Sequence, residues 1–478
     1  MTNSTPSSKS STDTMENTDI EASKQQFTDD KQQQQQQEYN YKDDPDNPLN
    51  WSKSKKYTGF FIVFMMSFMG YFTSAVYMPA THDIMVYFNT NLTVINATIA
   101  LYIMMNAIAP LFLAPLSERV GRRWVYIICM AIYTVCTIVC GISKGIGLFF
   151  AFRLLQGIFG SVGQAVGGGT VSDIFEPHER GRAMGIYMLG TILGPAIAPV
   201  IGGYLDQYLG WRWIFYVCTI LGGAITIAAL FFLKETLYRP GQKEVAPIGI
   251  KERLERFKFN PFASLQMLAL PEVGLSCLPV SIAFGWFYYF VTILPATFGE
   301  IYGFSSGSIG LCYLAGGVGN VVGAIVAGFS SDKLYQRSIA NNGGIVIKEF
   351  RLRTIYFSVF FYLAGSLMYG WFLQYRIFWF ATLVGYALTT FGLMSAITTV
   401  NTYIVEAHLK KAASVVSSNN FARNTCAMIF SLCAVSIRGS LGDGWSYTFM
   451  GLMTTVSFLI CIPLVQKYGP RWRELANA

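Results

Sequence analysis

The sequence predicts an all-α membrane protein whose helices cross the bilayer in two groups. The chain of 478 residues is 53% hydrophobic and only 13% charged, with a mean hydropathy of +0.40, which is too apolar for an ordinary soluble protein. Apolar runs of about 20 residues, long enough to span a bilayer, recur along the chain. One long polar segment divides these runs into two sets. We therefore expect two helical bundles embedded in a membrane.

The chain begins with a polar segment of low complexity. Residues 1–50 contain the glutamine run Gln32–Gln37 and lack the basic-then-apolar pattern of a signal peptide. A lysine cluster, Lys53–Lys56, then precedes the first apolar run, as is typical of a cytosolic approach to lipid headgroups. We expect residues 1–50 to form a disordered cytosolic tail.

Twelve runs meet the length and hydropathy that a spanning helix needs. They lie near 57–79, 95–116, 124–142, 147–171, 184–205, 213–233, 272–298, 307–329, 354–374, 377–402, 413–437 and 447–466. The predicted domains are thus one bundle over 51–233, a central cytosolic loop over 234–271 with a short surface helix at Gly249–Phe257, and a second bundle over 272–466. Residues 467–478 are expected to be a cytosolic tail.

The short loops alternate in basic charge, and this sets the predicted orientation. One set of loops carries Arg119, Arg122, Arg123, Arg180, Arg182, Lys333, Arg337, Lys348, Arg351, Arg353, Lys410 and Lys411; the opposite set carries little beyond Lys144, Arg212, Arg376 and Arg438. Both termini are therefore predicted to be cytosolic. Because the net charge of +8 comes from these connectors, it does not indicate nucleic-acid binding. The first external loop contains two glycosylation acceptor patterns, at Asn91 and Asn96.

Enzyme chemistry and cofactor binding are not predicted. The nine cysteines form no CxxC pair, and the chain has only three histidines, His82, His178 and His408. No Ser/His/Asp grouping, phosphate loop or metal spacing appears. We expect reduced cysteines that pack in the core, no metal or cofactor, and a monomer whose partners are a small molecule, protons and the lipid bilayer.

The loop after the second span carries a charged motif that recurs in the second half. In APLSERVGRR, Ala114–Arg123, the charges of Glu118 and Arg122 can pair with Asp173 at the end of the fourth span, and GFSSDK at Gly328–Lys333 repeats part of the spacing. Such a pair can hold one conformation and release in another; alternatively, the loop is basic only because it is cytosolic. Internal duplication of a transporter places its substrate site between the repeats.

Polar side chains within the spans are candidates for coupling and for substrate binding. Arg153, two turns inside the fourth span, costs at least a few kcal/mol at depth and should face a cavity or a partner, unless it reaches the external headgroups. We predict that Arg423 in a late span mirrors it. Around GWFYYF, Gly285–Phe290, the aromatic rings either stack on a ligand or face lipid. The predicted cavity residues are Asn106, Gln164, Tyr288, Tyr289, Asn320, Asn420 and Arg423.

The fifth span, LGTILGPAIAPVIGGYL, combines glycine and proline within an apolar run. Gly190, Gly194, Ala198 and Gly202 recur every fourth residue, and Pro195 and Pro199 share another face. A stripe of small residues permits close helix contact, and the prolines remove backbone donors and bend the helix. We expect a bend important to motion at Gly190, Gly194, Pro195, Gly202 and Gly203.

These motifs in this order resemble the major facilitator superfamily. APLSERVGRR is similar to its loop signature, with Ala114 and Glu118 in place of the usual glycine and aspartate; FRLLQGIFGSVG resembles the fourth-span signature, and the fifth span resembles the antiporter signature. DPDNPLNWSKSKKY, SDIFEPHERGRAMGIY, GWRWIFYV and KETLYRP narrow the resemblance to the fungal twelve-span drug:proton antiporters. It extends from about residue 43 to the C-terminus.

The resemblance implies the major facilitator fold, with two pseudo-symmetric six-helix bundles that rock in alternating access. It implies export of lipophilic or cationic compounds, such as drugs and polyamine-like molecules, across the plasma membrane, driven by inward proton movement. By the same resemblance Arg153 takes part in proton exchange, Glu118, Arg122 and Asp173 form a cytosolic charge relay, and Gly194 and Pro195 form the antiporter bend.

The proton carrier is not evident from the sequence. An antiporter needs a group whose protonation competes with substrate, and no acid lies in the middle of a span. The candidates are His82, Asp83, Asp173 and Glu406, of which Asp83 is preferred because burial at a helix end would favour its protonated form while His82 lies beside it; both could instead cap a short external helix. An importer or facilitator of a small nutrient, and a non-transporting sensor, remain as alternative functions.

Overall fold

The computed structural model describes residues 47–238, 264–341, 348–408 and 411–477, and within these ranges it is helical without strands. The first half contains η1 (Pro48–Asn50), α2 (Lys53–Ala75), η2 (Met78–Ala80), α3 (Thr81–Tyr87), α4 (Leu92–Val120), α5 (Arg122–Ile142), α6 (Ile146–Gly160), α7 (Val162–Ile174), α8 (Pro177–Leu209) and α9 (Arg212–Phe232). The second half contains η3 (Ser264–Ala269), α11 (Pro271–Tyr302), α12 (Ser306–Asn341), η4 (Lys348–Thr354), α13 (Ile355–Gln374), α14 (Trp379–Ala407) and α15 (Ala412–Asn477).

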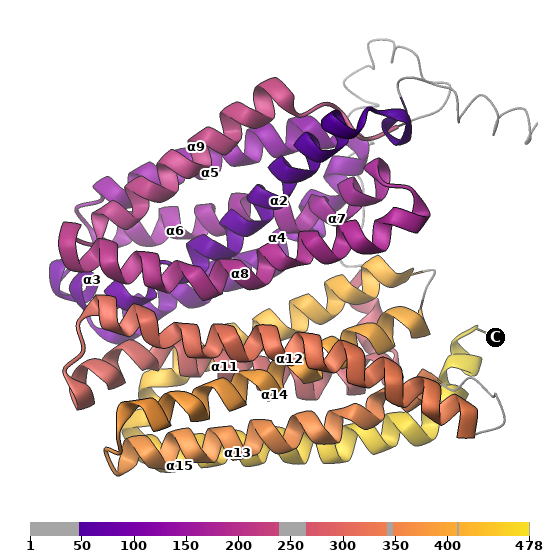
Figure 1. The fold of residues 1–478 in the computed structure, drawn as a ribbon. Helices are drawn as coiled ribbons and strands as arrows, with labels where there is room; N and C mark the ends of the chain where they lie inside the picture. Colours follow the sequence, from indigo (N-terminus) through magenta and orange to yellow (C-terminus); the bar gives the residue numbers. More distant parts are fainter. Residues whose placement is uncertain (1–46, 239–263, 342–347, 409–410, 478) are drawn as a thin grey trace, which may run out of the picture.

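The described residues contain eleven apolar segments long enough to cross a membrane, and the last of them crosses it twice. That segment, Ser414–Arg473, has 60 residues. At about 1.5 Å per residue a straight helix of this length would be about three times as long as the hydrocarbon core is thick. Gly442, with φ of 70°, interrupts α15, and the chain turns back there (Figure 1). The predicted fold class, with twelve transmembrane helices, is confirmed.

The two halves have the same pattern of neighbouring helices. In the first bundle α5 packs against α6 and α9, and α2 packs against α8; in the second, α13 packs against α14 and the second part of α15, and α11 packs against the first part. The first part of α15 therefore corresponds to α8, and α14 corresponds to α6 with α7. The prediction that Arg423 mirrors Arg153 is wrong, because Arg423 lies on the counterpart of α8 and not of α6.

Several helices extend beyond their predicted bounds. Helix α8 begins at Pro177, α12 continues to Asn341, and the predicted C-terminal tail is helical to Asn477. Hydropathy detects only the part of a helix that hydrocarbon can cover, whereas backbone hydrogen bonding continues into the polar layer. The predicted disorder of residues 1–46 and the surface helix at 249–257 lie outside the described residues. For residues 47–50 the prediction of disorder is wrong, because Asn47 is buried and caps η1.

Both described termini lie at one end of the molecule, on the right of Figure 1, which we call the terminal end; the opposite end is the distal end. The halves contact each other mainly through α8 with α12 and α4 with α15. Near the distal end the backbones of α8 and α12 are in close contact. A Cβ added at Gly203 would lie under 3.0 Å from Ser306, and one added at Gly310 would lie under 3.0 Å from Pro199. Near the terminal end no atom of another described segment lies within 4 Å of such a Cβ at Gly185 or Gly328. The two helices thus separate toward the terminal end.

Candidate functional site

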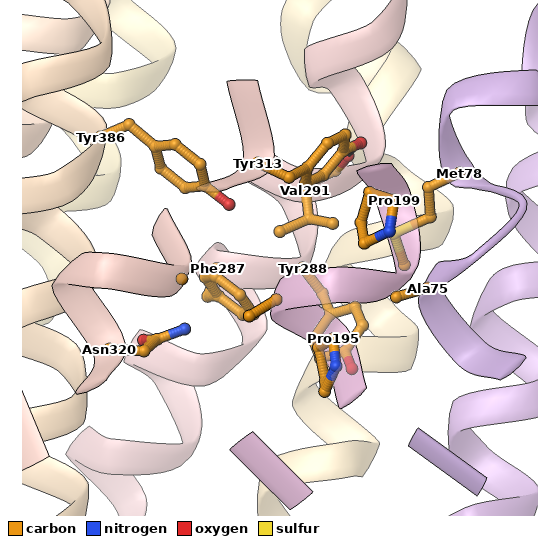
Figure 2. A pocket seen from close by; sticks show the side chains of 12 residues that line it. Ala75, Met78, Pro195, Pro199, Phe287, Tyr288, Val291, Tyr313, Asn320 and Tyr386 are labelled. Atoms are coloured by element: carbon orange, nitrogen blue, oxygen red, sulfur yellow. Dashed lines mark hydrogen bonds between the residues drawn. The ribbon is translucent and has the colours of Figure 1, made fainter. Parts of the chain in front are cut away.

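A pocket lies between the two halves, near the middle of the contact between α8 and α12 (Figure 2). Its volume is about 30 Å³, which is room for about one water molecule. Residues from six elements line it: Ala75, Met78, Pro195, Ala196, Pro199, Phe287, Tyr288, Val291, Tyr313, Gly317, Asn320 and Tyr386. Of the predicted cavity residues, Tyr288 and Asn320 line this pocket, as does Pro195 of the predicted bend.

The aromatic run on α11 divides between two environments. Phe284, Phe287 and Tyr288 contact one another, and the last two line the pocket. Trp286 and Tyr289 are fully buried inside the second bundle, where Trp286 stacks on Phe430 at 4.4 Å between ring centroids. The first three rings can therefore reach a ligand. Tyr289, predicted to line the cavity, instead packs in the bundle core, and Trp286 beside it does not face lipid.

Arg423 lies beside this aromatic cluster on the first part of α15. Its guanidinium is 4.9 Å from the ring centroid of Phe284, and its Nη2 donates a hydrogen bond to Asn420 Oδ1. Of the residues that the structure describes, the titratable groups that act on it are Tyr71, Cys277 and Tyr288, none of which is a carboxylate. Tyr71 precedes the pocket residue Ala75 by one helical turn, and Phe284 precedes the pocket residue Tyr288 by the same interval. Since α2 and α11 start at the terminal end, Arg423 lies on the terminal side of the pocket.

Arg153, in contrast, is enclosed inside the first bundle and is only 1% exposed. Its guanidinium lies over the rings of Tyr77 and Tyr102, at 4.1 and 4.5 Å from their centroids, and its Nη1 donates to Gln156 Oε1 at 2.7 Å. Gln156 in turn donates to Thr137. The side chain therefore lies in an aromatic cage within one half and does not reach the external headgroups.

The remaining predicted polar residues lie in different places. Asn106 is buried in the first bundle, Gln164 is half-buried on α7, and Asn420 contacts Arg423. Asn91 is exposed and caps α4 by accepting a hydrogen bond from the backbone N–H of Val94. Asn96 is 0% exposed within α4, so the prediction of a glycosylation site there is wrong, because no glycan could be attached without opening the bundle.

Helix α8 uses its two small faces for two different contacts. Gly190, Gly194 and Gly202 face α2, where a Cβ at Gly202 would overlap the backbone oxygen of Val76. Pro195, Pro199 and Gly203 face the other half, at the pocket and at Ser306. The helix is continuous through both prolines. One face of α8 thus binds it to its own bundle, and the other forms the contact between bundles.

A buried acid that the sequence analysis did not select lies at the distal end of this contact. Asp206, one turn after Gly202 and Gly203, is 4% exposed, and neither carboxylate oxygen accepts a hydrogen bond from the described residues. The groups that act on it electrostatically are the carboxylate of Asp83 and the hydroxyl of Ser306, with no basic side chain among them. Asp83 on α3 is exposed, so the burial expected for it is wrong. The structure therefore brings the preferred proton carrier, Asp83, beside a second acid.

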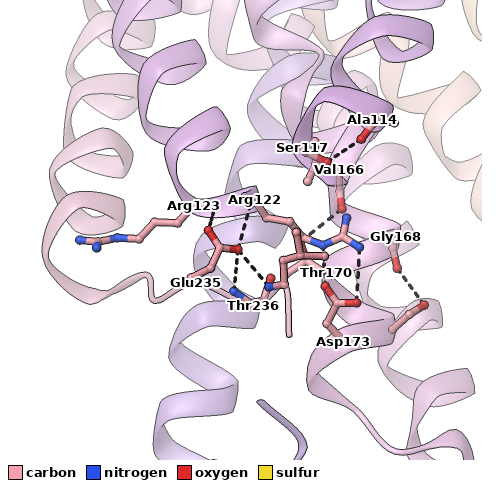
Figure 3. A network of polar contacts seen from close by, with 12 residues as sticks. Ala114, Ser117, Arg122, Arg123, Val166, Gly168, Thr170, Asp173, Glu235 and Thr236 are labelled. Atoms are coloured by element: carbon pink, nitrogen blue, oxygen red, sulfur yellow. Dashed lines mark hydrogen bonds and ion pairs between the residues drawn. The ribbon is translucent and has the colours of Figure 1, made fainter. Parts of the chain in front are cut away.

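At the terminal end, Arg122 pairs with Asp173 (Figure 3). Nε of Arg122 donates to Asp173 Oδ2, and the backbone N–H groups of Arg122 and Arg123 donate to the carboxylate of Glu235, which follows α9. Glu235 thus caps the N-terminus of α5, where a negative charge is favoured. Glu118, predicted as part of this relay, is exposed in the last turn of α4. The pair of Arg122 with Asp173 was predicted from the charges alone. The cap that Glu235 forms on α5 was not predicted.

The second half has an equivalent charge cluster. Nε and Nη2 of Arg351 donate to the two carboxylate oxygens of Glu406, each at 2.7 Å, and Nη1 donates to Asp332. Asp332 belongs to GFSSDK, the repeat of the first-half motif, and Glu406 ends α14 as Asp173 ends the corresponding α7. The predicted duplication therefore extends to the ion pairs. Glu406, considered as a proton carrier, is paired with this arginine.

Comparisons with known proteins agree with this architecture. The family model described as Major Facilitator Superfamily matches residues 60–432. The MFS-type transporter tndD of Aspergillus flavipes is 32% identical over 90% of this chain and 84% of its own, and the efflux pump radE of Floropilus chiversii is 31% identical over 90% and 84%. Among solved structures, a partially occluded inward-open form of the Escherichia coli xylose transporter XylE covers 87% of this chain and 98% of its own, at 13% identity, with a TM-score of 0.62.

Proposed function

We propose that this chain, which belongs to the Major Facilitator Superfamily and to its fungal efflux-type transporters, exports lipophilic small molecules from the cytosol in exchange for protons. The family and the twelve spans make it a multi-pass membrane transporter. Residence in the plasma membrane, both termini in the cytosol and an activity that is transport alone are parts of the proposal. In this orientation the terminal end faces the cytosol and the distal end faces the exterior.

The observation that carries proton coupling is the Asp206–Asp83 pair. Asp206 lies where α8 of one half meets α12 of the other, and no described basic side chain neutralises it. A proton on one of two adjacent carboxylates removes the repulsion between them, and it also removes the cost of a buried charge. Protonation from the exterior would therefore favour the closed distal contact seen here.

The transport cycle follows from that preference. In the proposed outward-open state Asp206 meets external water and takes up a proton, after which the distal end closes and the terminal end opens. Substrate then enters from the cytosol toward Tyr288 and Asn320, and the proton leaves to the cytosol through the open terminal end, which allows the distal end to reopen. The aromatic cage of Arg153 supports the first bundle during this motion, and the Arg122–Asp173 pair holds its cytosolic end.

Proton-driven dye uptake into proteoliposomes tests this function. Vesicles with an imposed pH gradient would be incubated with one of two external dyes, cationic rhodamine 123 or anionic fluorescein, and compared with vesicles that lack the protein. We expect the gradient to drive at least one dye in the wild type and in Asp443→Asn, but not in Asp206→Asn. Asp443 is the matched control because it lies at the same end but is paired with Arg438.

Two results would count against proton antiport. Dye movement that ignores the gradient would favour a facilitator or importer of a small metabolite. Gradient-driven movement that survives Asp206→Asn would assign the proton to another group.

A further inference from the structure

Arg423 is a cation at the contact between the halves whose described surroundings do not neutralise its charge. Its hydrogen-bond acceptor is the neutral amide of Asn420, and its Nε has no hydrogen-bond partner among the described residues. Among the described residues, the titratable groups that act on it are tyrosines and a cysteine, and no carboxylate is among them. By contrast, Arg122, Arg351 and Arg438 each pair with at least one acid.

An unpaired cation at this depth is costly, and such residues mark ligand pathways in membrane proteins. Arg153 likewise has no acidic partner in the described structure, but its guanidinium is enclosed by Tyr77, Tyr102 and Gln156 inside one bundle, whereas Arg423 lies at the contact between the halves. A guanidinium there, with no partner for its Nε among the described residues, matches an anion, since carboxylates accept two parallel hydrogen bonds from it.

The surroundings of Arg423 indicate what is attached to that anion. Phe284, Phe287 and Tyr288 form a continuous aromatic surface from Arg423 to the pocket. Tyr71 of the first half is close enough to act electrostatically on the same guanidinium, and Thr425 Oγ1, two residues after Arg423, lies 3.9 Å from Met104 Sδ of the first half, so both bundles border the site. A flat apolar body would lie on these rings while its charged group contacts the guanidinium.

We propose that the substrates are aromatic or otherwise lipophilic carboxylates, recognised by Arg423, and not lipophilic cations. This rests on the proposed export function and names its substrate class. The guanidinium would repel a cation bound on the same rings. The resemblance implied lipophilic or cationic substrates, and this repulsion favours lipophilic anions instead. The position of Arg423 on the terminal side of the pocket makes it the first charged group that a substrate from the cytosol meets.

A binding experiment with three matched naphthalene probes tests the proposal. Naphthalene-2-carboxylate, naphthalene-2-carboxamide and 2-naphthylmethylammonium share one apolar body and differ in charge. Calorimetric titration of the purified full chain in detergent at pH 7 would measure their dissociation constants. We expect the carboxylate to bind at least about tenfold more tightly than the amide, and the ammonium to bind more weakly than both.

Variants separate recognition from folding. Arg423→Gln should abolish the preference for the carboxylate, and Arg423→Lys should keep part of it because the charge remains. Arg212→Gln is the control, since Arg212 lies at the distal end over Tyr87 and Trp211. Size-exclusion profiles establish that each variant is folded, and if Arg423→Gln is not, the comparison of Arg423→Lys with wild type decides.

Three outcomes would overturn the proposal: no binding of any probe at millimolar concentration, a wild type that prefers the amide or the ammonium, or a carboxylate preference that survives Arg423→Gln. Because binding needs no proton gradient, the preference can hold even where gradient-driven transport fails. Failure of the proposed function and failure of this inference therefore give different results.

Discussion

The adjacent glycines Gly202 and Gly203 on α8 allow the contact within a bundle to be separated from the contact between bundles. A Cβ at Gly202 would overlap the backbone of Val76 on α2, in the same half. A Cβ at Gly203 would lie under 3.0 Å from the backbone of Ser306 on α12, in the other half. In both cases the obstructing atom is a main-chain oxygen, which cannot move aside as a side chain can. We therefore predict different outcomes for alanine at the two positions.

The magnitude follows from the cost of overpacking. Inserting one methyl group against a fixed neighbour costs about 1–3 kcal/mol. For Gly203→Ala the cost applies only when the distal end is closed, so the equilibrium between closed and open distal ends should shift toward the open state by about 5- to 150-fold. For Gly202→Ala the helices α2 and α8 belong to one bundle and stay together in both states. The same cost should then appear as lost stability, with no change in the equilibrium.

Distance measurements between spin labels would distinguish the two effects. Tyr208 and Tyr375 are 73% and 71% exposed at the distal ends of the two halves, and cysteines there can be labelled after Cys426 and Cys433 are replaced by serine. Gly203→Ala should increase the population with a long distance between the labels, and Gly202→Ala should lower the melting temperature instead. An unchanged distance distribution in Gly203→Ala, or the same shift in both variants, would refute the reasoning.

Three further predictions concern charge and modification. Asp206→Asn should make the population of the closed distal end independent of external pH, whereas in the wild type this population should fall as pH rises; the same spin labels report it, and a persisting pH dependence would exclude Asp206 as the proton site. Arg351→Gln should cost about 2 kcal/mol of stability, because it leaves the partly buried carboxylate of Glu406 and the exposed carboxylate of Asp332 without their shared cation; an unchanged melting temperature would argue that solvent already neutralises them. In a glycosylating host, Asn91→Gln should remove any glycan that an endoglycosidase detects and Asn96→Gln should not, since Asn96 is buried; a shift caused by Asn96→Gln would contradict the packing of α4.

Spacing and composition predicted the helices well, because hydrocarbon imposes the same demand on every span. The predicted pairing of Arg122 with Asp173 also followed from charge and position in the chain. Asp206 was missed because it stands near a predicted span end, where an acid is unremarkable; its burial depends on tertiary packing, which the sequence pattern does not contain. Similarly, we predicted that Arg423 mirrors Arg153 in the other half, because both are arginines inside spans. Their different roles depend on which helix of each bundle carries them, and hydropathy holds no such information.

The distribution of charge suggests that the two ends of the transporter are controlled differently. Arg122 and Arg351 pair with acids of their own halves at the terminal end, so these ion pairs stiffen each bundle but do not join the bundles in this conformation. At the distal end the halves meet through glycine and proline backbones, with Asp206 as the buried acid beside that contact. Protonation can then act on the distal contact alone. Opening and closing of the terminal end would follow as a consequence, because two rigid bundles that separate at one end must approach at the other.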